Sequence, residues 1–266
     1  MLDKSEKFRW LVRLGYFSRA VFYTMLGFIA LTNVAQISQG VDGIFEAIEG
    51  FPGGTALLWV MALGLLGYAL FRFCSPLFDV ENEGSDAHGW ARRIGHGGSA
   101  IGHLVLAWSA YRLASADVSG AGDGAQEAAA GVLSVQLGGL VIGVLGIAFF
   151  LAAISQAKKG VSGSFMARIG AGAPEGTRVL GAIGYTARAV VFLVIGWSLV
   201  KAGFYSGDAG EVRTLGDAVT SLAGNQIVFQ GVALGLLVFG LFSFILARYR
   251  IVPDLAPDGR KPRYRA

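Results

Sequence analysis

Residues 14–28 read LGYFSRAVFYTMLGF, and residues 183–197 read IGYTARAVVFLVIGW. Both stretches open a long apolar run with the pattern Gly-Tyr-x-x-Arg-Ala-Val, and they align without a gap. A helix that crosses a bilayer needs about 20 mostly apolar residues, and each run reaches that length. The repeated stretch therefore predicts two equivalent membrane-spanning helices, one near each end of the chain.

The composition of the whole chain agrees with a membrane protein. Of its 266 residues, 54% are hydrophobic and only 15% are charged, whereas a soluble domain carries about 25% charged residues. Forty glycines accompany this shortage of charge, and glycine is more frequent in membrane-spanning helices than in soluble ones. High hydrophobicity excludes intrinsic disorder, and a single cysteine excludes an internal disulfide framework.

Six runs with little or no charge are long enough, or nearly so, to cross a bilayer. Only the fifth of them contains a charged residue, which is Arg188. Polar, glycine-rich connections too short to fold as separate domains lie between the runs. We therefore expect an all-α bundle of six transmembrane helices, over residues 20–41, 51–71, 94–111, 128–157, 179–200 and 218–247.

The even-numbered runs also resemble one another. Residues 62–71 read ALGLLGYALF, residues 233–242 read ALGLLVFGLF and residues 142–150 read IGVLGIAFF. The predicted unit is therefore a pair of helices that occurs three times. Two spans per unit make the three repeats parallel and relate them by an axis along the membrane normal. We expect a pseudo-threefold arrangement of units at residues 1–78, 79–160 and 161–252, followed by a basic cytoplasmic tail at residues 253–266.

A short acidic segment separates the two spans of the first unit. Within residues 42–49, the spacing of Ile44, Phe45 and Ile48 places these side chains on one face of a helix. One interpretation is a short helix on the outer membrane surface, with Asp42 as its cap. An ordinary turn is the other, and residues 217–222 are the expected counterpart in the third unit.

Lys and Arg are unevenly distributed between the two ends of the predicted spans. The N-terminal segment, the connections after the second and fourth runs and the C-terminal segment are rich in both. The three opposite connections contain only Arg112, Lys201 and Arg213 and are rich in Asp and Glu. Because cytoplasmic loops carry the excess of Lys and Arg, we expect both termini in the cytoplasm and an acidic outer face.

In its repeated motif the chain resembles a bacterial family described as domain of unknown function 1206. The resemblance covers about residues 10–250, and the middle unit departs from the pattern at His96 and Ser99. It implies a multi-pass protein of the bacterial inner membrane built from three tandem two-helix units, and it implies no activity or cofactor. The residues that carry the resemblance are Gly15, Tyr16, Arg19, Gly184, Tyr185 and Arg188.

Arg19 and Arg188 are the leading candidate functional residues, because a charge at the centre of a span costs about 2.5–3.5 kcal/mol. Both lie about one turn inside the expected cytoplasmic boundary. One interpretation is that they extend to lipid phosphates at the membrane surface. The other is that they face the bundle interior and bind an anionic substrate or headgroup. Beside them, Tyr16 and Tyr185 belong to the same candidate lipid- or anion-binding group. We expect them to anchor the helices in the aromatic belt, with a hydroxyl that hydrogen-bonds across helices as the alternative.

His96 and His103 are the polar residues of the third run. Their spacing places them on one face about two turns apart, and that separation, about 10.5 Å of rise, is too great for one metal ion. We expect hydrogen bonds between helices, with a proton relay as the alternative, and neither a metal nor a cofactor. The chain has no P-loop, H-E-x-x-H, C-x-x-C or G-x-S-x-G motif, so we expect no enzyme.

The sequence favours a non-enzymatic membrane component that binds lipids or other membrane proteins. The expected partners are anionic headgroups at the cytoplasmic face and, through close-packing glycines such as Gly231 and Gly235, a second copy or another membrane protein. Anionic lipid explains the basic tail better than nucleic acid does. The alternative is a small transporter or channel with a path through or between the units.

Overall fold

The computed structural model describes residues 4–37, 39–79, 81, 83–115 and 124–252. The regular elements within these residues are helices. Ile169 and Arg250 also form an isolated antiparallel β-bridge. The prediction of an all-α protein is therefore confirmed. The predicted basic tail, residues 253–266, lies outside the described residues.

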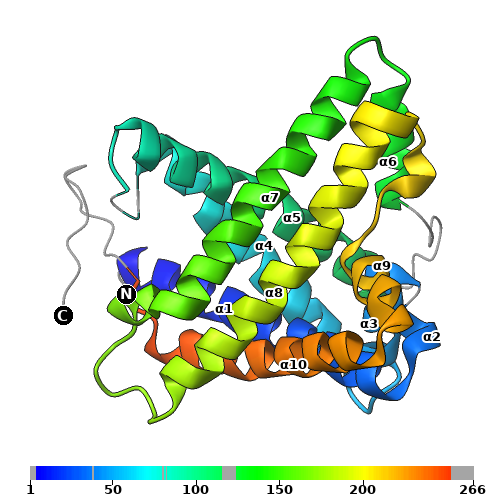
Figure 1. Ribbon diagram of the computed structural model, residues 1–266. Helices are drawn as coiled ribbons and strands as arrows, with labels where there is room; N and C mark the ends of the chain where they lie inside the picture. Colours follow the sequence, from blue (N-terminus) through cyan, green and yellow to red (C-terminus); the bar gives the residue numbers. More distant parts are fainter. Residues whose placement is uncertain (1–3, 38, 80, 82, 116–123, 253–266) are drawn as a thin grey trace.

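Each predicted run corresponds to a long helix (Figure 1). Five helical segments are long and apolar enough to cross a membrane, namely Arg9–Thr32, Gly54–Phe78, Gly138–Ser162, Thr177–Ser206 and Gln226–Tyr249. The helix that covers the third run is long enough but more polar, since it contains His96, Ser99 and His103. The long helices are α1 (Lys4–Thr32), α4 (Gly54–Phe78), α5 (Ala87–Ala114), α7 (Gly138–Ser162), α8 (Thr177–Val200) and α10 (Gln226–Tyr249).

Shorter helices lie between the long ones. In the first unit α1 ends at Thr32, earlier than predicted, because the chain turns there into two short helices. Ile44, Phe45 and Ile48 are all buried, so the predicted apolar face exists and packs against α4 and α5. The short helices are α2 (Val34–Ile37), α3 (Gly40–Glu49), α6 (Gly124–Leu133), η1 (Ser164–Arg168), η2 (Lys201–Ser206), η3 (Ala209–Glu211), α9 (Leu215–Thr220) and η4 (Ser221–Gly224).

The fourth and sixth runs are each divided, whereas a single span was predicted for each. Residues 128–157 belong to α6 and α7, and a Cβ atom at Gly138 would collide with the carbonyl oxygen of Val132 across the turn between them. Residues 218–247 belong to α9, η4 and α10. There Asn225 is extended and its side chain accepts a hydrogen bond from the Val228 N–H at 3.2 Å, which caps α10 and separates it from the preceding turn.

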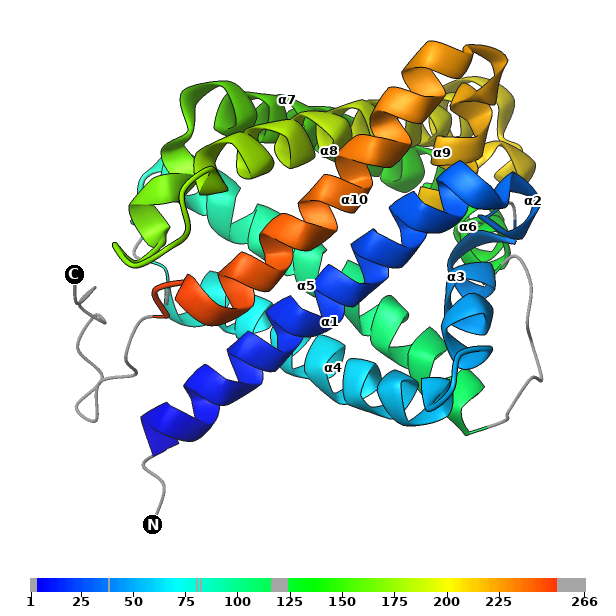
Figure 2. The ribbon, with the colours of Figure 1, turned by 90° about the horizontal axis from the view of Figure 1, so that it is seen from below.

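The long helices pack in three close pairs, α1 with α10, α4 with α5 and α7 with α8 (Figure 2). Two further contacts, α1 with α4 and α8 with α10, join these pairs, so the helices follow the order α5, α4, α1, α10, α8, α7. The two helices at the ends of this order, α5 and α7, do not pack closely against each other. These are the helices of the predicted middle unit, and we call the boundary between them the α5–α7 seam.

The two ends of the bundle differ. The start of α1, the end of α10 and the α4–α5 and α7–α8 connections lie at one end, which we call the basic end, while α3, α6 and α9 lie at the other (Figure 2). Ion pairs from Glu81 to Arg168 and to Arg250 hold three of these segments together at the basic end. The grouping of basic segments that the sequence predicts is therefore present.

Glycines of the repeated motif allow the two long helices of the first and third units to pack closely. Gly15 lies against Tyr68 of α4, and Gly184 lies against Phe239 of α10, so closely that a Cβ atom would clash at either position. Tyr68 and Phe239 occupy the same place in the similar stretches 62–71 and 233–242. The same glycine–aromatic contact therefore joins the two helices of each of these units.

The middle unit lacks this contact. Gly95, which corresponds to Gly15, has no neighbour within 4 Å of a Cβ position. The place of the aromatic residue is taken by Ile147, whose side chain is exposed. The departure from the motif in sequence thus coincides with the α5–α7 seam in structure.

Candidate functional site

Arg19 points into the bundle. It is only 5% exposed, and its guanidinium carbon lies 4.6 Å from the ring centroid of Tyr16 and 5.6 Å from that of Tyr68. A third ring, that of Phe239, is 5.2 Å away. Its Nη1 donates a hydrogen bond to the Tyr68 hydroxyl at 3.2 Å. The interpretation that Arg19 extends to the membrane surface is therefore wrong.

Arg188 approaches the same aromatic ring from α8. Its guanidinium carbon lies 4.7 Å from the ring centroid of Phe239 and 5.3 Å from that of Tyr23. The side chain is half-buried, and its Nη1 donates a hydrogen bond of 3.5 Å to Gln156 on α7. The structure thus brings the two predicted arginines together at the ring of Phe239, and we call Arg19, Arg188, Tyr68 and Phe239 the arginine site.

The arginine site has hydrogen-bond donors to spare. Buried Nε and Nη2 of Arg19 and Nε of Arg188 have no acceptor. Among the residues that the structure describes, neither guanidinium has a carboxylate oxygen within 4.0 Å. A buried charge is costly unless it is paired and hydrogen-bonded. The protein itself does not supply enough hydrogen-bond acceptors or negative charge for the two arginines, so the site is suited to bind an anion.

The two predicted tyrosines are packed inside the protein. Tyr16 is 1% exposed and meets the ring of Tyr68 edge-on at 5.1 Å, so it is not the aromatic-belt anchor that was predicted. Tyr185 is half-buried and lies 5.5 Å from the ring of Phe239 and 5.1 Å from that of Phe165. Both tyrosines therefore support the aromatic surroundings of the arginines.

The histidines of α5 face two different groups. The Nδ1 of His103 donates a hydrogen bond to the Ser99 carbonyl in its own helix at 2.7 Å. The sequence predicted a hydrogen bond to another helix, and Nδ1 does not form one. The His103 ring lies 4.5 Å from that of Tyr68, which places it beside the arginine site. His96 instead has its Nε2 3.4 Å from Glu81.

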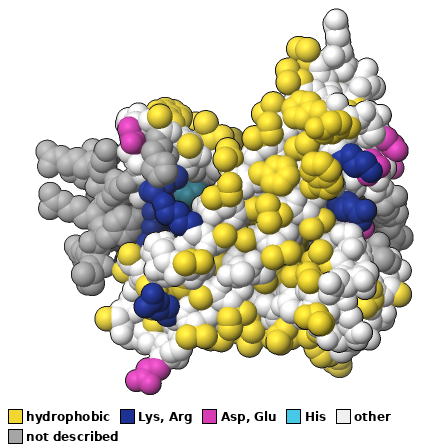
Figure 3. Space-filling model, viewed as in Figure 1, with side chains coloured by type: hydrophobic (Ala, Val, Ile, Leu, Met, Phe, Trp, Pro, Cys, Tyr) yellow, Lys and Arg dark blue, Asp and Glu magenta, His cyan; other side chains and the backbone are white. Residues whose placement is uncertain are grey.

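Glu81, which the sequence reasoning missed, is the centre of a second charged group. It is 2% exposed and accepts hydrogen bonds from Arg250 at 2.7 Å and Arg72 at 3.3 Å. Arg168 of η1 also binds it and binds Glu83 at 2.6 Å. We call these five residues the Glu81 cluster. Figure 3 shows Lys and Arg side chains gathered beside a histidine at this side of the molecule.

The charges around Glu81 keep it ionised. Burial by itself raises the pKa of the carboxyl, but the positive charges of Arg72 and Arg250 outweigh that effect and hold the pKa well below its ordinary value. Arg72 also donates from Nε to the Tyr68 hydroxyl at 2.9 Å. That hydroxyl therefore accepts from both Arg19 and Arg72 and joins the cluster to the arginine site.

The Glu81 cluster is better suited to ion pairing than to metal binding. Ligand atoms of Glu81, Glu83 and His96 lie within 4.8 Å of one another, a spacing that a metal ion could use. Guanidinium groups already occupy the Glu81 oxygens, however, and their positive charge opposes a divalent cation. The sequence signal that could have located the cluster is the group of four acidic residues, Asp79, Glu81, Glu83 and Asp86, in a connection at the basic end.

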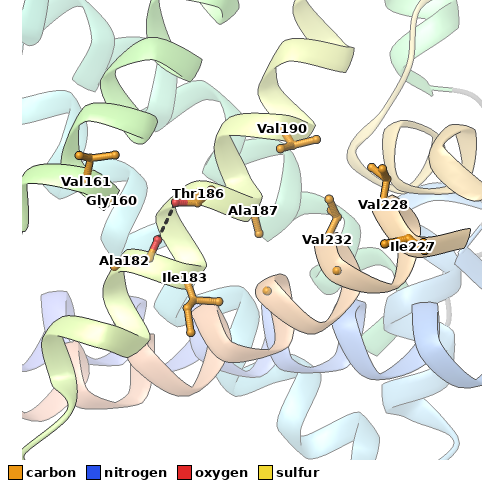
Figure 4. Close-up of a pocket in the computed structure, with 12 residues that line it drawn as sticks. Gly160, Val161, Ala182, Ile183, Thr186, Ala187, Val190, Ile227, Val228 and Val232 are labelled. Carbon is orange, nitrogen blue, oxygen red and sulfur yellow. Dashed lines mark hydrogen bonds between the residues drawn. The ribbon is translucent and has the colours of Figure 1, made fainter. Parts of the chain in front are cut away.

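An apolar groove of about 480 Å³ lies apart from these charged groups, between the end of α7, α8 and α10 (Figure 4). Ile183, Ala187 and Ile227 are among its lining residues. Of the predicted close-packing glycines, Gly235 contacts Ala187, whereas Gly231 has no neighbour within 4 Å of a Cβ position. The groove offers hydrocarbon surface and no charge, so it is not the candidate site.

Comparison with known proteins agrees with the repeated motif. A family model described as Domain of Unknown Function (DUF1206) matches residues 14–78 and 183–250, the stretches that contain the two intact Gly-Tyr-x-x-Arg motifs. The chain is 30% identical over 263 residues to "Uncharacterized protein YxxB" of Bacillus subtilis (strain 168), an alignment that covers 93% of this chain and 94% of that protein. No solved structure matches.

Proposed function

The chain belongs to the DUF1206 family, and we propose that it is a non-enzymatic, six-span protein of the bacterial inner membrane that binds the headgroup of an anionic lipid at the arginine site. The observation that carries this proposal is the buried guanidinium of Arg19, which retains two unused donor atoms beside a second arginine. Guanidinium groups match the geometry of phosphate oxygens and form short, charge-assisted hydrogen bonds with them.

We propose α5 as the sixth span. Its polar face is turned toward Tyr68 and Glu81 within the protein, while Ile101, Val105 and Trp108 are exposed as lipid-facing residues would be. An even number of spans also accounts for the start of α1 and the end of α10 lying at the same end (Figure 2). The excess of Lys and Arg at that end supports a cytoplasmic location for it.

The order long helix, short helix, long helix occurs three times along the chain, with α3, α6 and α9 as the short members. This order and the equivalent contacts of Gly15 and Gly184 support three parallel repeats about a pseudo-threefold axis. The repeats would hold the two arginines at equivalent positions in the first and third units. The middle unit, with Ser99 at that position, would contribute space instead of charge.

The test compares bound lipid in matched arginine variants. Arg19→Gln and Arg188→Gln remove the charge at the arginine site, whereas Arg178→Gln removes an exposed charge from the start of α8. Phosphatidylglycerol retained by each purified protein in mild detergent is counted by native mass spectrometry. We expect both site variants to bind about tenfold less, which corresponds to about 1.4 kcal/mol, and the control to match the wild type. Equal retention by all four proteins would disprove the proposal.

A transporter or channel for a small anion is the second candidate, and the inward position of Arg19 favours it. A transport path also needs a way through the opposite end of the bundle, where the buried α3 residues Ile44, Phe45 and Ile48 are packed. Flux of phosphate or chloride into liposomes that contain the protein separates the two candidates. Measurable flux that Arg19→Gln abolishes would favour transport over lipid binding.

A further inference from the structure

The α5–α7 seam is bordered by small and polar side chains. On α5, Gly95, Gly98 and Gly102 have no neighbour within 4 Å of their Cβ positions. On α7, Gln156 and Lys159 are half-buried and three residues apart, so they share one face of the helix. Gln156 accepts the hydrogen bond from Arg188. The seam therefore borders directly on the arginine site.

The donors of the arginine site lie within reach of this seam. Arg19 is 95% buried, with Nε and Nη2 unpartnered. It donates a hydrogen bond to the Tyr68 hydroxyl, and the Tyr68 ring lies 4.5 Å from that of His103 on α5. Three basic groups, those of Arg19, Arg188 and Lys159, are thus distributed around the inner side of a boundary at which the helices do not pack closely. An anionic group is the complementary ligand.

The outer side of the seam is apolar. Ile94 and Ile101 of α5 and Leu151 and Ile154 of α7 are exposed, and both helices are spans of the proposed six-helix protein. A molecule at the seam would therefore meet hydrocarbon on the outer side and positive charge on the inner side. A phospholipid with a net negative headgroup has both chemical parts, whereas a free anion has only one.

We propose that the α5–α7 seam is the lateral opening through which an anionic phospholipid places its headgroup at Arg19 and Arg188 while its acyl chains remain between α5 and α7. The inference rests on the proposed lipid-binding function and adds the route and the position of the lipid. The missing Gly-Tyr-x-x-Arg motif of the middle unit has a role in this arrangement, since a closed α5–α7 contact would exclude the lipid.

The test fills the seam without touching the arginines. Gly98→Leu and Gly102→Leu add side chains where no atom lies within 4 Å, and leucine is a better helix former than glycine. Gly231→Leu is the matched control, because Gly231 is also without a neighbour but lies in the apolar groove of α10. Each purified protein is mixed with phosphatidylcholine vesicles with or without phosphatidylglycerol, and bound lipid is counted by native mass spectrometry.

We expect both seam variants to bind about tenfold less phosphatidylglycerol than the wild type, and Gly231→Leu to bind as much as the wild type. Seam variants that keep the lipid while Arg19→Gln loses it would overturn the lateral opening and leave the proposed function standing. Retention by the arginine variants as well would overturn both. Competition by inorganic phosphate would show that the site opens to water, which also contradicts the lateral route.

Discussion

Replacement of Glu81 by glutamine tests how far one buried carboxylate holds the basic end together. The side chain of Glu81 is 1% exposed and binds Arg250, Arg168 and Arg72. Glutamine keeps the shape but removes the charge, so three guanidiniums lose their shared anion. Breaking a buried ion pair from one side costs about 3–5 kcal/mol.

The lower part of that range applies here, because two of the partners keep other acceptors. Arg168 retains Glu83 at 2.6 Å, and Arg72 retains the Tyr68 hydroxyl at 2.9 Å. A loss of about 3 kcal/mol lowers the melting temperature by roughly 6–12 °C for a protein of this size.

The assay is thermal unfolding in detergent, followed by circular dichroism. Glu175→Gln is the control, since Glu175 is an exposed carboxylate in the α7–α8 connection at the same end. A decrease for Glu81→Gln that equals the decrease for Glu175→Gln would refute the reasoning. It would mean that water, Glu83 and the Tyr68 hydroxyl together satisfy the three guanidiniums without the charge of Glu81.

Three further predictions concern pH, capping and packing. The pKa of Glu81 is depressed in the folded state, so its stabilising effect is fully present above the unfolded value of about 4.3. The difference in stability between wild type and Glu81→Gln should stay constant from neutral pH to that value and shrink only below it, and a difference that shrinks at higher pH would contradict this assignment. Asn225→Ala removes the cap of α10 and should reduce the free energy of unfolding by about 1 kcal/mol in chemical denaturation, whereas no change would show that water caps the helix equally well. Gly184→Val should lose about 1–3 kcal/mol through its clash with Phe239, while Gly95→Ala, which meets no neighbour, should not destabilise; equal melting temperatures for the two variants would contradict the packing described.

Positions of the long helices could be predicted because hydropathy along the chain is a local property. The places where the prediction failed are also local in origin. Residues 128–157 and 218–247 are uncharged throughout, so charge could not show that each contains a turn. The first turn depends on Gly138, where a side chain would not fit, and the second depends on Asn225, whose side chain caps the next helix. Because asparagine is a common N-cap residue, the second turn could have been predicted from the sequence.

The Glu81 cluster could not be predicted from a single sequence. Glu81, Arg168 and Arg250 are far apart in the chain and meet only because two connections and the end of α10 converge at the basic end. Counts of Lys and Arg describe each connection separately and contain no information on which charges meet. The repeat suggested equivalent arginines, but not that both would contact the single ring of Phe239.

By itself, the sequence determined the membrane class, the positions of the long helices and the repeated Gly-Tyr-x-x-Arg motif, because these follow from composition and spacing. Only the tertiary structure decided that Arg19 and Tyr16 face inward and that α5 and α7 stay apart. The physical reason is that lipid tails are as apolar as a protein core. A helix in a bilayer therefore needs no polar outer face, and its sequence does not reveal which side meets its neighbours.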